Sequence, residues 1–248
     1  MHLLVVNPNT TASMTATIAA AARAAAGPST VIEAVTSTMG PASIEGYYDE
    51  ALAVPGLLAE IARGERAGAA AAIIACFDDT GLDAARAMAT IPVIGICEAA
   101  LSLASFLARR FTVVTMSQRS LVPVAELVRR YGMEPRARVR ALGIPVLELE
   151  DPASSAVAAL RGEIARALAE EHAEAIVLGC AGMADLAAAL REEFGIPVVD
   201  GVGAAVKQAE ALVALGLATG KRGAYARPAV KPYAGLLAGF GLEGKAVA

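Results

Sequence analysis

The stretch IIACFDDTGLDAA (residues 73–85) recurs 104 residues later as VLGCAGMADLAAA (residues 177–189). In each copy a short apolar run ends at a cysteine, and a loop and a helical segment follow. The motif IPVI (residues 91–94) then recurs as IPVV (residues 196–199), with an offset of 105 residues. Matching order and spacing over two strands and two helices predict two similar lobes, related by a pseudo-two-fold axis, with a cleft between them.

The rest of the chain alternates short runs of Val, Ile and Leu with alanine-rich helical stretches. Apolar strands separated by helices are typical of parallel sheets covered on both faces, so we predict an α/β fold. The predicted strands are residues 3–6, 30–34, 72–75, 92–94, 112–114, 139–142, 175–178 and 197–199. The predicted helices include residues 51–63, 82–88, 99–108, 122–130, 155–171, 185–193 and 204–215.

These elements divide the chain into two lobes of similar size. We assign residues 1–98 to the first lobe and residues 99–204 to the second. Residues 205–248 are expected to complete the first lobe, because the tail after Gly220 leaves the repeat pattern and is predicted to pack back on that lobe.

Charge and composition argue against several classes of partner. The chain has 248 residues, with 21 basic and 25 acidic side chains, a net charge of −4 and no tryptophan. Because no basic patch is visible and few aromatic side chains are present to stack on bases, we expect no nucleic acid and no anionic membrane as partner.

The mean hydropathy of +0.55 raises the question of a membrane span. The longest near-apolar stretch, residues 67–77, falls short of the ~20 residues that a spanning helix needs. The apolar run Leu3–Val6 is too short for a signal sequence. The three cysteines, an odd number without clustered spacing, fit neither a disulfide framework nor a zinc site. We therefore expect a reduced, cytoplasmic protein with no metal site.

Cys76 and Cys180 are the candidate catalytic residues. Each ends a predicted buried strand and precedes a helix, and ligands bind at this carboxyl edge of an open α/β sheet. The positive end of the following helix is expected to lower the thiol pKa. Cys97 is expected to be a core residue, because Val202 occupies its place in the repeat.

Two thiols on opposite walls of a cleft suit the inversion of a carbon centre. One thiolate removes a proton from one face of the carbon, and the opposing thiol returns a proton to the other face. This chemistry requires no metal, flavin or pyridoxal cofactor.

Other polar groups give weaker signals. Asp78 and Asp79 are expected to cap the next helix, with contact to a ligand as the alternative. The turn NPNT (residues 7–10) follows the first strand and lies at the edge of the predicted cleft, so a binding role and an ordinary turn are equally open. His2 and His172 are expected to be structural.

Four motifs of this chain together resemble those of hydantoin racemases, in the aspartate/glutamate racemase superfamily. They are NPNT (residues 7–10), GPASIEG (residues 40–46), ACFDD (residues 75–79) and GCAGM (residues 179–183), and the resemblance covers nearly the whole chain. It implies two flavodoxin-like lobes, cofactor-independent racemisation of 5-monosubstituted hydantoins, a homo-oligomer, and Cys76 and Cys180 as the catalytic pair. It further implies a substrate pocket lined by Asn9, Ser43, Ile44, Phe77, Asp78, Asp79, Thr115, Ser117, Ala181, Gly182 and Met183.

The chemistry of a hydantoin agrees with these residue types. Its C5 carbanion is an enolate that needs hydrogen-bond donors, and the implied pocket offers amides, hydroxyls and backbone N–H groups. The sequence AGM (residues 181–183) departs from the Cys-Thr-Glu type of amino-acid racemases, which argues against a free amino acid as substrate. Allantoin, itself a 5-substituted hydantoin, is the close alternative. A single-cysteine decarboxylase and a non-catalytic two-lobed binding protein are the remaining ones.

Overall fold

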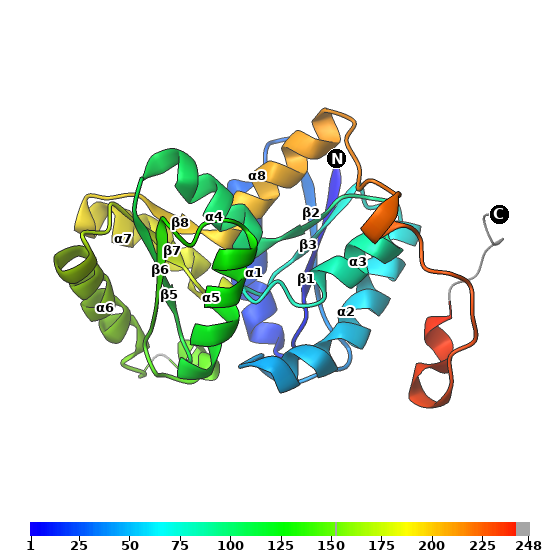
Figure 1. The fold of residues 1–248 in the computed structure, drawn as a ribbon, viewed down its shortest axis with the longest axis horizontal. Helices are drawn as coiled ribbons and strands as arrows, with labels where there is room; N and C mark the ends of the chain where they lie inside the picture. The colour runs from blue at the N-terminus through cyan, green and yellow to red at the C-terminus, as the bar shows by residue number, and fades with distance from the viewer. Residues whose placement is uncertain (152, 242–248) are drawn as a thin grey trace.

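The computed structural model describes residues 1–151 and 153–241, and within these ranges the chain forms two parallel β-sheets (Figure 1). The first sheet has the order β2-β1-β3-β4, and the second has the equivalent order β6-β5-β7-β8. The strands are β1 (His2–Asn7), β2 (Val31–Thr36), β3 (Ala71–Ile74), β4 (Val93–Gly95), β5 (Phe111–Thr115), β6 (Ala137–Ala141), β7 (Ala175–Leu178) and β8 (Val198–Asp200). The predicted α/β fold with two similar lobes is confirmed.

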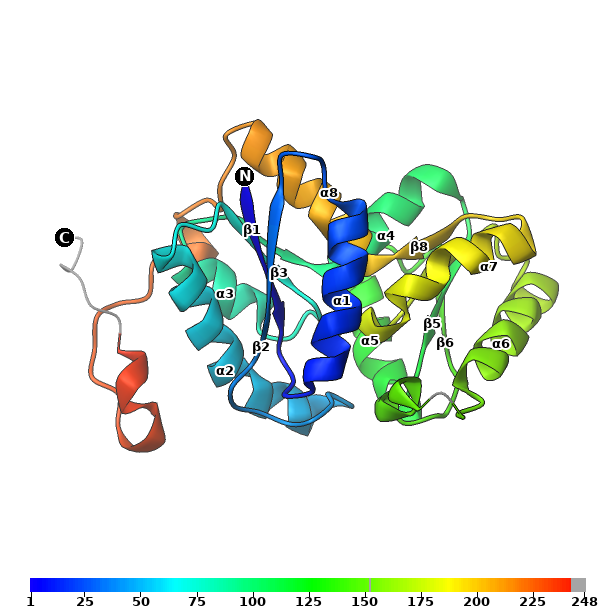
Figure 2. The same cartoon turned by 180° about the vertical axis from the view of Figure 1, so that it is seen from behind.

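Helices separate the strands and cover both faces of each sheet (Figures 1 and 2). They are α1 (Ala12–Ala25), α2 (Tyr47–Arg66), α3 (Leu82–Met88), α4 (Ile96–Leu107), α5 (Leu121–Arg130), α6 (Ala156–Glu171), α7 (Ala187–Phe194) and α8 (Gly201–Ala214). The sequence analysis named no helix at α1. The helix predicted for residues 185–193 corresponds to α7, except that its first two residues belong to a 3-10 helix, Ala181–Leu186.

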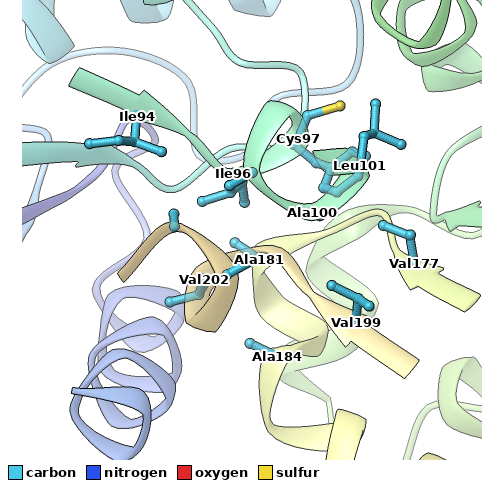
Figure 3. Close-up of a cluster of buried hydrophobic side chains, with 14 of the residues drawn as sticks. Ile94, Ile96, Cys97, Ala100, Leu101, Val177, Ala181, Ala184, Val199 and Val202 are labelled. Atoms are coloured by element: carbon cyan, nitrogen blue, oxygen red, sulfur yellow. The ribbon is translucent and has the colours of Figure 1, made fainter. Parts of the chain in front are cut away.

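The two lobes are joined by the pair of helices α4 and α8, which pack against each other. Helix α4 also packs on β7 and β8 of the second sheet, whereas α8 packs on β3 and β4 of the first. Gly201 permits the close approach, since a Cβ atom there would lie 2.7 Å from the Ile96 carbonyl oxygen. Cys97 and Val202 are fully buried at matching positions of these helices (Figure 3), as their places in the repeat predict.

The start of the C-terminal tail lies against α3 of the first lobe. Lys221 donates to the Ala87 carbonyl at 3.1 Å, and the Tyr225 hydroxyl donates to Asp83 at 2.9 Å. Beyond Tyr225 the described tail, residues 226–241, leaves the body of the molecule (Figures 1 and 2). Within residues 221–241, the predicted packing against the first lobe is therefore found at residues 221–225, and residues 242–248 lie outside the described residues.

The described helices include none with the length and apolar character required to cross a membrane.

Candidate active site

Cys76 and Cys180 lie at equivalent carboxyl ends of the two sheets. Backbone hydrogen bonds continue one residue past β3 and β7, where Ala75 donates to Val6 at 2.9 Å and Gly179 donates to Val114 at 2.8 Å. The next residue in each case is the cysteine. Both cysteines line one cavity of about 40 Å³, so the two sheets bring the candidate catalytic pair together as the sequence predicts.

Burial dominates the ionisation of both thiols. It raises the pKa of Cys76 well above its usual value of 9.0, with a further rise from the charge of Asp78. It raises the pKa of Cys180 to about 12. The expectation of lowered thiol pKa values is therefore wrong for the ligand-free protein. A five-residue turn separates Cys76 from α3, and only a 3-10 helix follows Cys180, so helix dipoles do not offset desolvation.

Each sulfur nevertheless has a backbone donor two residues further along the chain. The N–H groups of Asp78 and Gly182 act on Cys76 and Cys180 respectively and lower the thiol pKa values, against the effect of burial. The Thr80 side chain acts on Cys76 in the same direction. At neutral pH both groups are thus thiols, ready to act as acids, and one must lose its proton before it acts as a base.

The turn that contains Asn7 and Asn9 forms a second wall of the cavity. Asn7 Nδ2 donates to Asn9 Oδ1 at 2.8 Å and to Thr15 Oγ1 at 3.0 Å. Asn9 Oδ1 also accepts the N–H of Thr11 at 2.9 Å. These bonds fix the Asn9 amide with its Nδ2 donor near the Met14 sulfur and at the cavity wall. Asn9 therefore offers a fixed donor to a polar ligand.

Some of the predicted pocket residues line the cavity, and the others lie outside its lining. Those that line the cavity with the two cysteines are Asn9, Ile44, Phe77, Asp78, Thr115 and Ala181. Those outside its lining are Ser43, Asp79, Ser117, Gly182 and Met183. Ser43 donates to Glu45 at 3.1 Å, the Ser117 hydroxyl accepts from the Arg119 N–H at 3.2 Å, and Met183 is fully buried in the core of the second lobe.

Several lining residues are not among the predicted pocket residues. They are Asn7, Met14, Ile18, Ala75, Ser120, Val146 and Gly179. Of these, Asn7, Ala75 and Gly179 lie in the quoted motifs. Met14 and Ile18 belong to α1, the helix that the sequence analysis did not name. The NPNT motif was the one available pointer to Asn7. A Cβ atom at Gly179 would lie 2.9 Å from the Val114 carbonyl oxygen, which explains why this wall is backbone.

Asp79 caps a helix, but a different one from the predicted α3. Its carboxylate accepts the N–H groups of Cys97 at 2.9 Å and Glu98 at 3.0 Å, at the start of α4. It also accepts the hydroxyl of Tyr131 at 2.7 Å. Burial raises the Asp79 pKa to about 6, and these three donors act in the opposite direction. Asp79 thus ties the loop after Cys76 to the helix that joins the lobes.

Several known proteins with similar sequence are racemases. The Asp/Glu/hydantoin racemase family matches residues 3–209. A hydantoin racemase from Rhizobium meliloti is 51% identical over 236 residues, which cover 95% of this chain and 98% of the relative. A hydantoin racemase from Pseudomonas sp. (strain NS671) is 48% identical over 242 residues, covering 97% of each chain.

A solved structure gives the same result. An allantoin racemase from Klebsiella pneumoniae superposes with a TM-score of 0.95 at 46% identity, covering 97% of this chain and 99% of that one. The match with the family spans most of the chain and includes both cysteines of the cavity. The protein is a member of the Asp/Glu/hydantoin racemase family, and hence an isomerase.

Proposed function

We propose that this protein racemises 5-monosubstituted hydantoins, with Cys76 and Cys180 as the acid–base pair. The observation that carries the proposal is the placement of two cysteines at equivalent strand ends on the wall of one cavity. The substrate class follows from the hydantoin racemases that are about half identical to this chain. The described lining of the cavity contains no Lys or Arg, which agrees with a ring that lacks a free carboxylate.

The proposed reaction is a proton exchange across the ring. The thiolate of one cysteine takes the proton from C5, which leaves an S–H bond and an enolate with its negative charge on the C4 oxygen. The thiol of the other cysteine gives its proton to the opposite face of C5 and becomes the thiolate. The Asn9 amide and the backbone N–H groups of the cavity are the donors that stabilise the enolate. The product leaves with inverted configuration, and no atom other than hydrogen is exchanged.

Allantoin is the second candidate substrate. It is itself a 5-substituted hydantoin, and the solved structure from Klebsiella pneumoniae is an allantoin racemase. The same two-thiol chemistry inverts its C5 atom. A decarboxylase that works with one cysteine agrees less well with a cavity that contains two.

Circular dichroism tests the function directly. The protein is incubated in D₂O with L- and D-5-benzylhydantoin and with each enantiomer of allantoin, and both optical signal and loss of the C5 hydrogen are followed. We expect each accepted substrate to lose its signal and to gain deuterium at C5. Binding without deuterium exchange would instead identify a non-catalytic binding protein and reject the proposal.

Three further features complete the proposal. The enzyme works as a homo-oligomer, as the resemblance implies. It works in the cytoplasm, where the catalytic thiols stay reduced. Residues 1–98 with 205–248, and residues 99–204, form its two structural units.

A further inference from the structure

A second cavity, of about 360 Å³, lies next to the one that contains the thiols. Its walls come from the start of α2, from the loop and first turn of α3 at residues 78–84, and from α5 (Figure 1). Asp78 lines both cavities, and Thr80, whose hydroxyl acts on Cys76, lines the second. The second cavity therefore adjoins the reaction site on the Cys76 side, with Asp78 in the wall of both.

The walls of this cavity carry an excess of negative charge. They contain five carboxylates and one cation, Arg130; the carboxylates are those of Glu50, Asp78, Asp79, Asp83 and Glu126. Arg130 forms an ion pair with Asp83. The other four carboxylates form no ion pair within residues 1–151 and 153–241. Of these, Asp79 accepts the three hydrogen bonds described above, and Glu126 accepts the Tyr47 hydroxyl at 2.9 Å.

Two oxygen atoms of this wall are shielded from solvent and accept no hydrogen bond in the described chain. They are Glu50 Oε1 and Thr80 Oγ1, of which Thr80 is 2% exposed and can direct its O–H toward Cys76 while its oxygen still accepts no hydrogen bond. Buried polar atoms normally have partners, because an unsatisfied one loses its hydrogen bonds to water without replacement. Both atoms can accept a hydrogen bond, so a donor-bearing ligand group would satisfy them.

The ionisation of the wall agrees with a missing cation. Burial raises the pKa of Asp78 to about 7, and repulsion from Glu50 and Asp79 adds to the rise. The pKa of Glu50 is raised by burial and by the charges of Glu126 and Asp49. A positive group between these carboxylates would offset both the desolvation and the repulsion.

The remaining lining suits the stem of a long side chain. Leu82, Pro123 and Leu127 supply apolar surface beside the carboxylates. A flexible stem of methylene groups packs on such a surface while its charged end reaches a polar partner. The space between the thiols, about 40 Å³, leaves little room for a long C5 substituent, whereas the second cavity is about nine times larger.

We propose that this second cavity binds the C5 substituent of the substrate and selects substituents that end in a cation, such as an aminoalkyl chain. The inference rests on the proposed function, since it takes C5 of a hydantoin to lie between the two thiols. The ammonium group lies among Glu50, Asp78 and Glu126 and donates to Glu50 Oε1 and Thr80 Oγ1. Hydantoins with a basic side chain are thus preferred over those with an apolar side chain of the same length.

Two hydantoins of equal size test this preference. In 5-(4-aminobutyl)hydantoin the chain ends in an ammonium group, and in 5-pentylhydantoin a methyl group takes its place. Calorimetry gives the Kd of each, and circular dichroism gives kcat/KM. We expect the cationic compound to bind about tenfold more tightly, as for one favourable charge contact in a partly buried site. Equal affinity, or tighter binding of the pentyl compound, overturns the inference.

Variants locate the selectivity. Glu50→Gln removes one charge and keeps the side-chain shape, so the preference for the cationic compound should fall about tenfold. Glu126→Gln, on the exposed face of α5, should lower the preference for the cationic compound by a smaller factor. This variant provides the test if the Glu50→Gln protein does not fold. Glu192→Gln, an exposed residue of α7 outside both cavities, removes the same charge and should keep the preference. A Glu50→Gln protein that folds and keeps the full preference contradicts the assignment.

Binding and turnover separate this inference from the proposed function. A protein that binds the aminobutyl compound preferentially but inverts neither hydantoin would refute the proposed racemase activity while supporting the cation-binding cavity. A protein that racemises both compounds with equal kcat/KM and equal Kd would support the activity and refute the selective cavity.

Discussion

At the scale of single residues, burial raises the pKa of both Cys76 and Cys180, because it disfavours the charged thiolate. The charge of Asp78, which lines their cavity, raises both thiol pKa values further. Only backbone N–H groups and the Thr80 side chain act the other way. Either thiolate is therefore a strong base, but only a small fraction of each thiol is ionised near neutral pH.

Serine substitutions separate the roles of the two thiols. Neither Cys76→Ser nor Cys180→Ser should racemise a hydantoin, because a serine hydroxyl has no useful anion near neutral pH. In D₂O each variant should still exchange the C5 hydrogen of one enantiomer, with retained configuration, and the two variants should act on opposite enantiomers. The fully buried Cys97 provides the control, since Cys97→Ala should keep nearly full activity and cost about 1 kcal/mol of stability or less. Exchange of both enantiomers by either serine variant would indicate a single catalytic base.

Asp78 is expected to reduce the stability of the fold at neutral pH. Its folded-state pKa of about 7 exceeds the usual 3.8, so the folded protein binds this proton more tightly than the unfolded chain does. The free energy of unfolding should therefore fall as the pH rises from about 4 to about 7. Asp78→Asn removes the effect and should stabilise the protein by about 2 to 4 kcal/mol at pH 8, with little gain at pH 4. Urea unfolding at the two pH values measures this, and an equal gain at both would contradict the buried charge.

At the scale of elements, the loop after β3 carries both a proposed catalytic residue and a residue that caps a helix. Within five residues it contains Cys76, Asp78 at both cavities, and Asp79 at the start of α4. Asp79 adopts a positive φ of 46°, which is unusual for a residue with a side chain, and its three hydrogen bonds hold this conformation. We therefore expect the position of the Cys76 sulfur to depend on the contact of Asp79 with Tyr131, the residue that follows α5.

Tyr131→Phe tests this dependence. The change removes the hydroxyl that donates to Asp79 and should cost about 1 to 3 kcal/mol, because a buried carboxylate loses a partner. If the contact also positions Cys76, kcat should fall while KM changes little, since the cavity lining is unaltered. Thermal unfolding and steady-state kinetics give the two readouts. A variant that loses stability but keeps its kcat would restrict Tyr131 to a structural role.

The sequence predicts the strands well and the cavity wall less well, for a physical reason. All eight strands were predictable, and six of them are short apolar runs in the buried part of a parallel sheet. The edge strands β2 and β6 carry charged residues and are mostly half-buried. The capping role of Asp79 toward α4 was not, because it joins residues 18 and 19 positions apart through a fold-dependent contact. The direction of the thiol pKa shift was also wrong, since desolvation depends on how tightly the loops close over each sulfur and not on position after a strand.

At the scale of the whole molecule, the internal repeat explains why one cavity receives two cysteines. Each half of the repeat supplies a sheet with one cysteine at its carboxyl edge, and α4 and α8 cross between the halves. The apolar core is continuous across them, with Ile96, Val199 and Val202 in one cluster (Figure 3). We therefore expect the packing of α4 against α8 to set the distance between the two sulfurs.

Gly201 is the point at which this packing is tightest, and Gly201→Ala tests its effect on catalysis. The added methyl group would lie 2.7 Å from the Ile96 carbonyl oxygen and 2.9 Å from its Cβ atom, so α4 and α8 must move apart. We expect a loss of about 1 to 3 kcal/mol in stability and a fall in kcat, because the sheets that hold the two thiols shift together with these helices. Gly162→Ala is the matched control, because this exposed glycine of α6 has no neighbour within 4 Å of the added atom. It should stabilise the protein by about 0.4 to 1 kcal/mol and leave kcat unchanged. If Gly201→Ala lowers stability but keeps the full kcat, then the lobe interface does not control the spacing of the thiols.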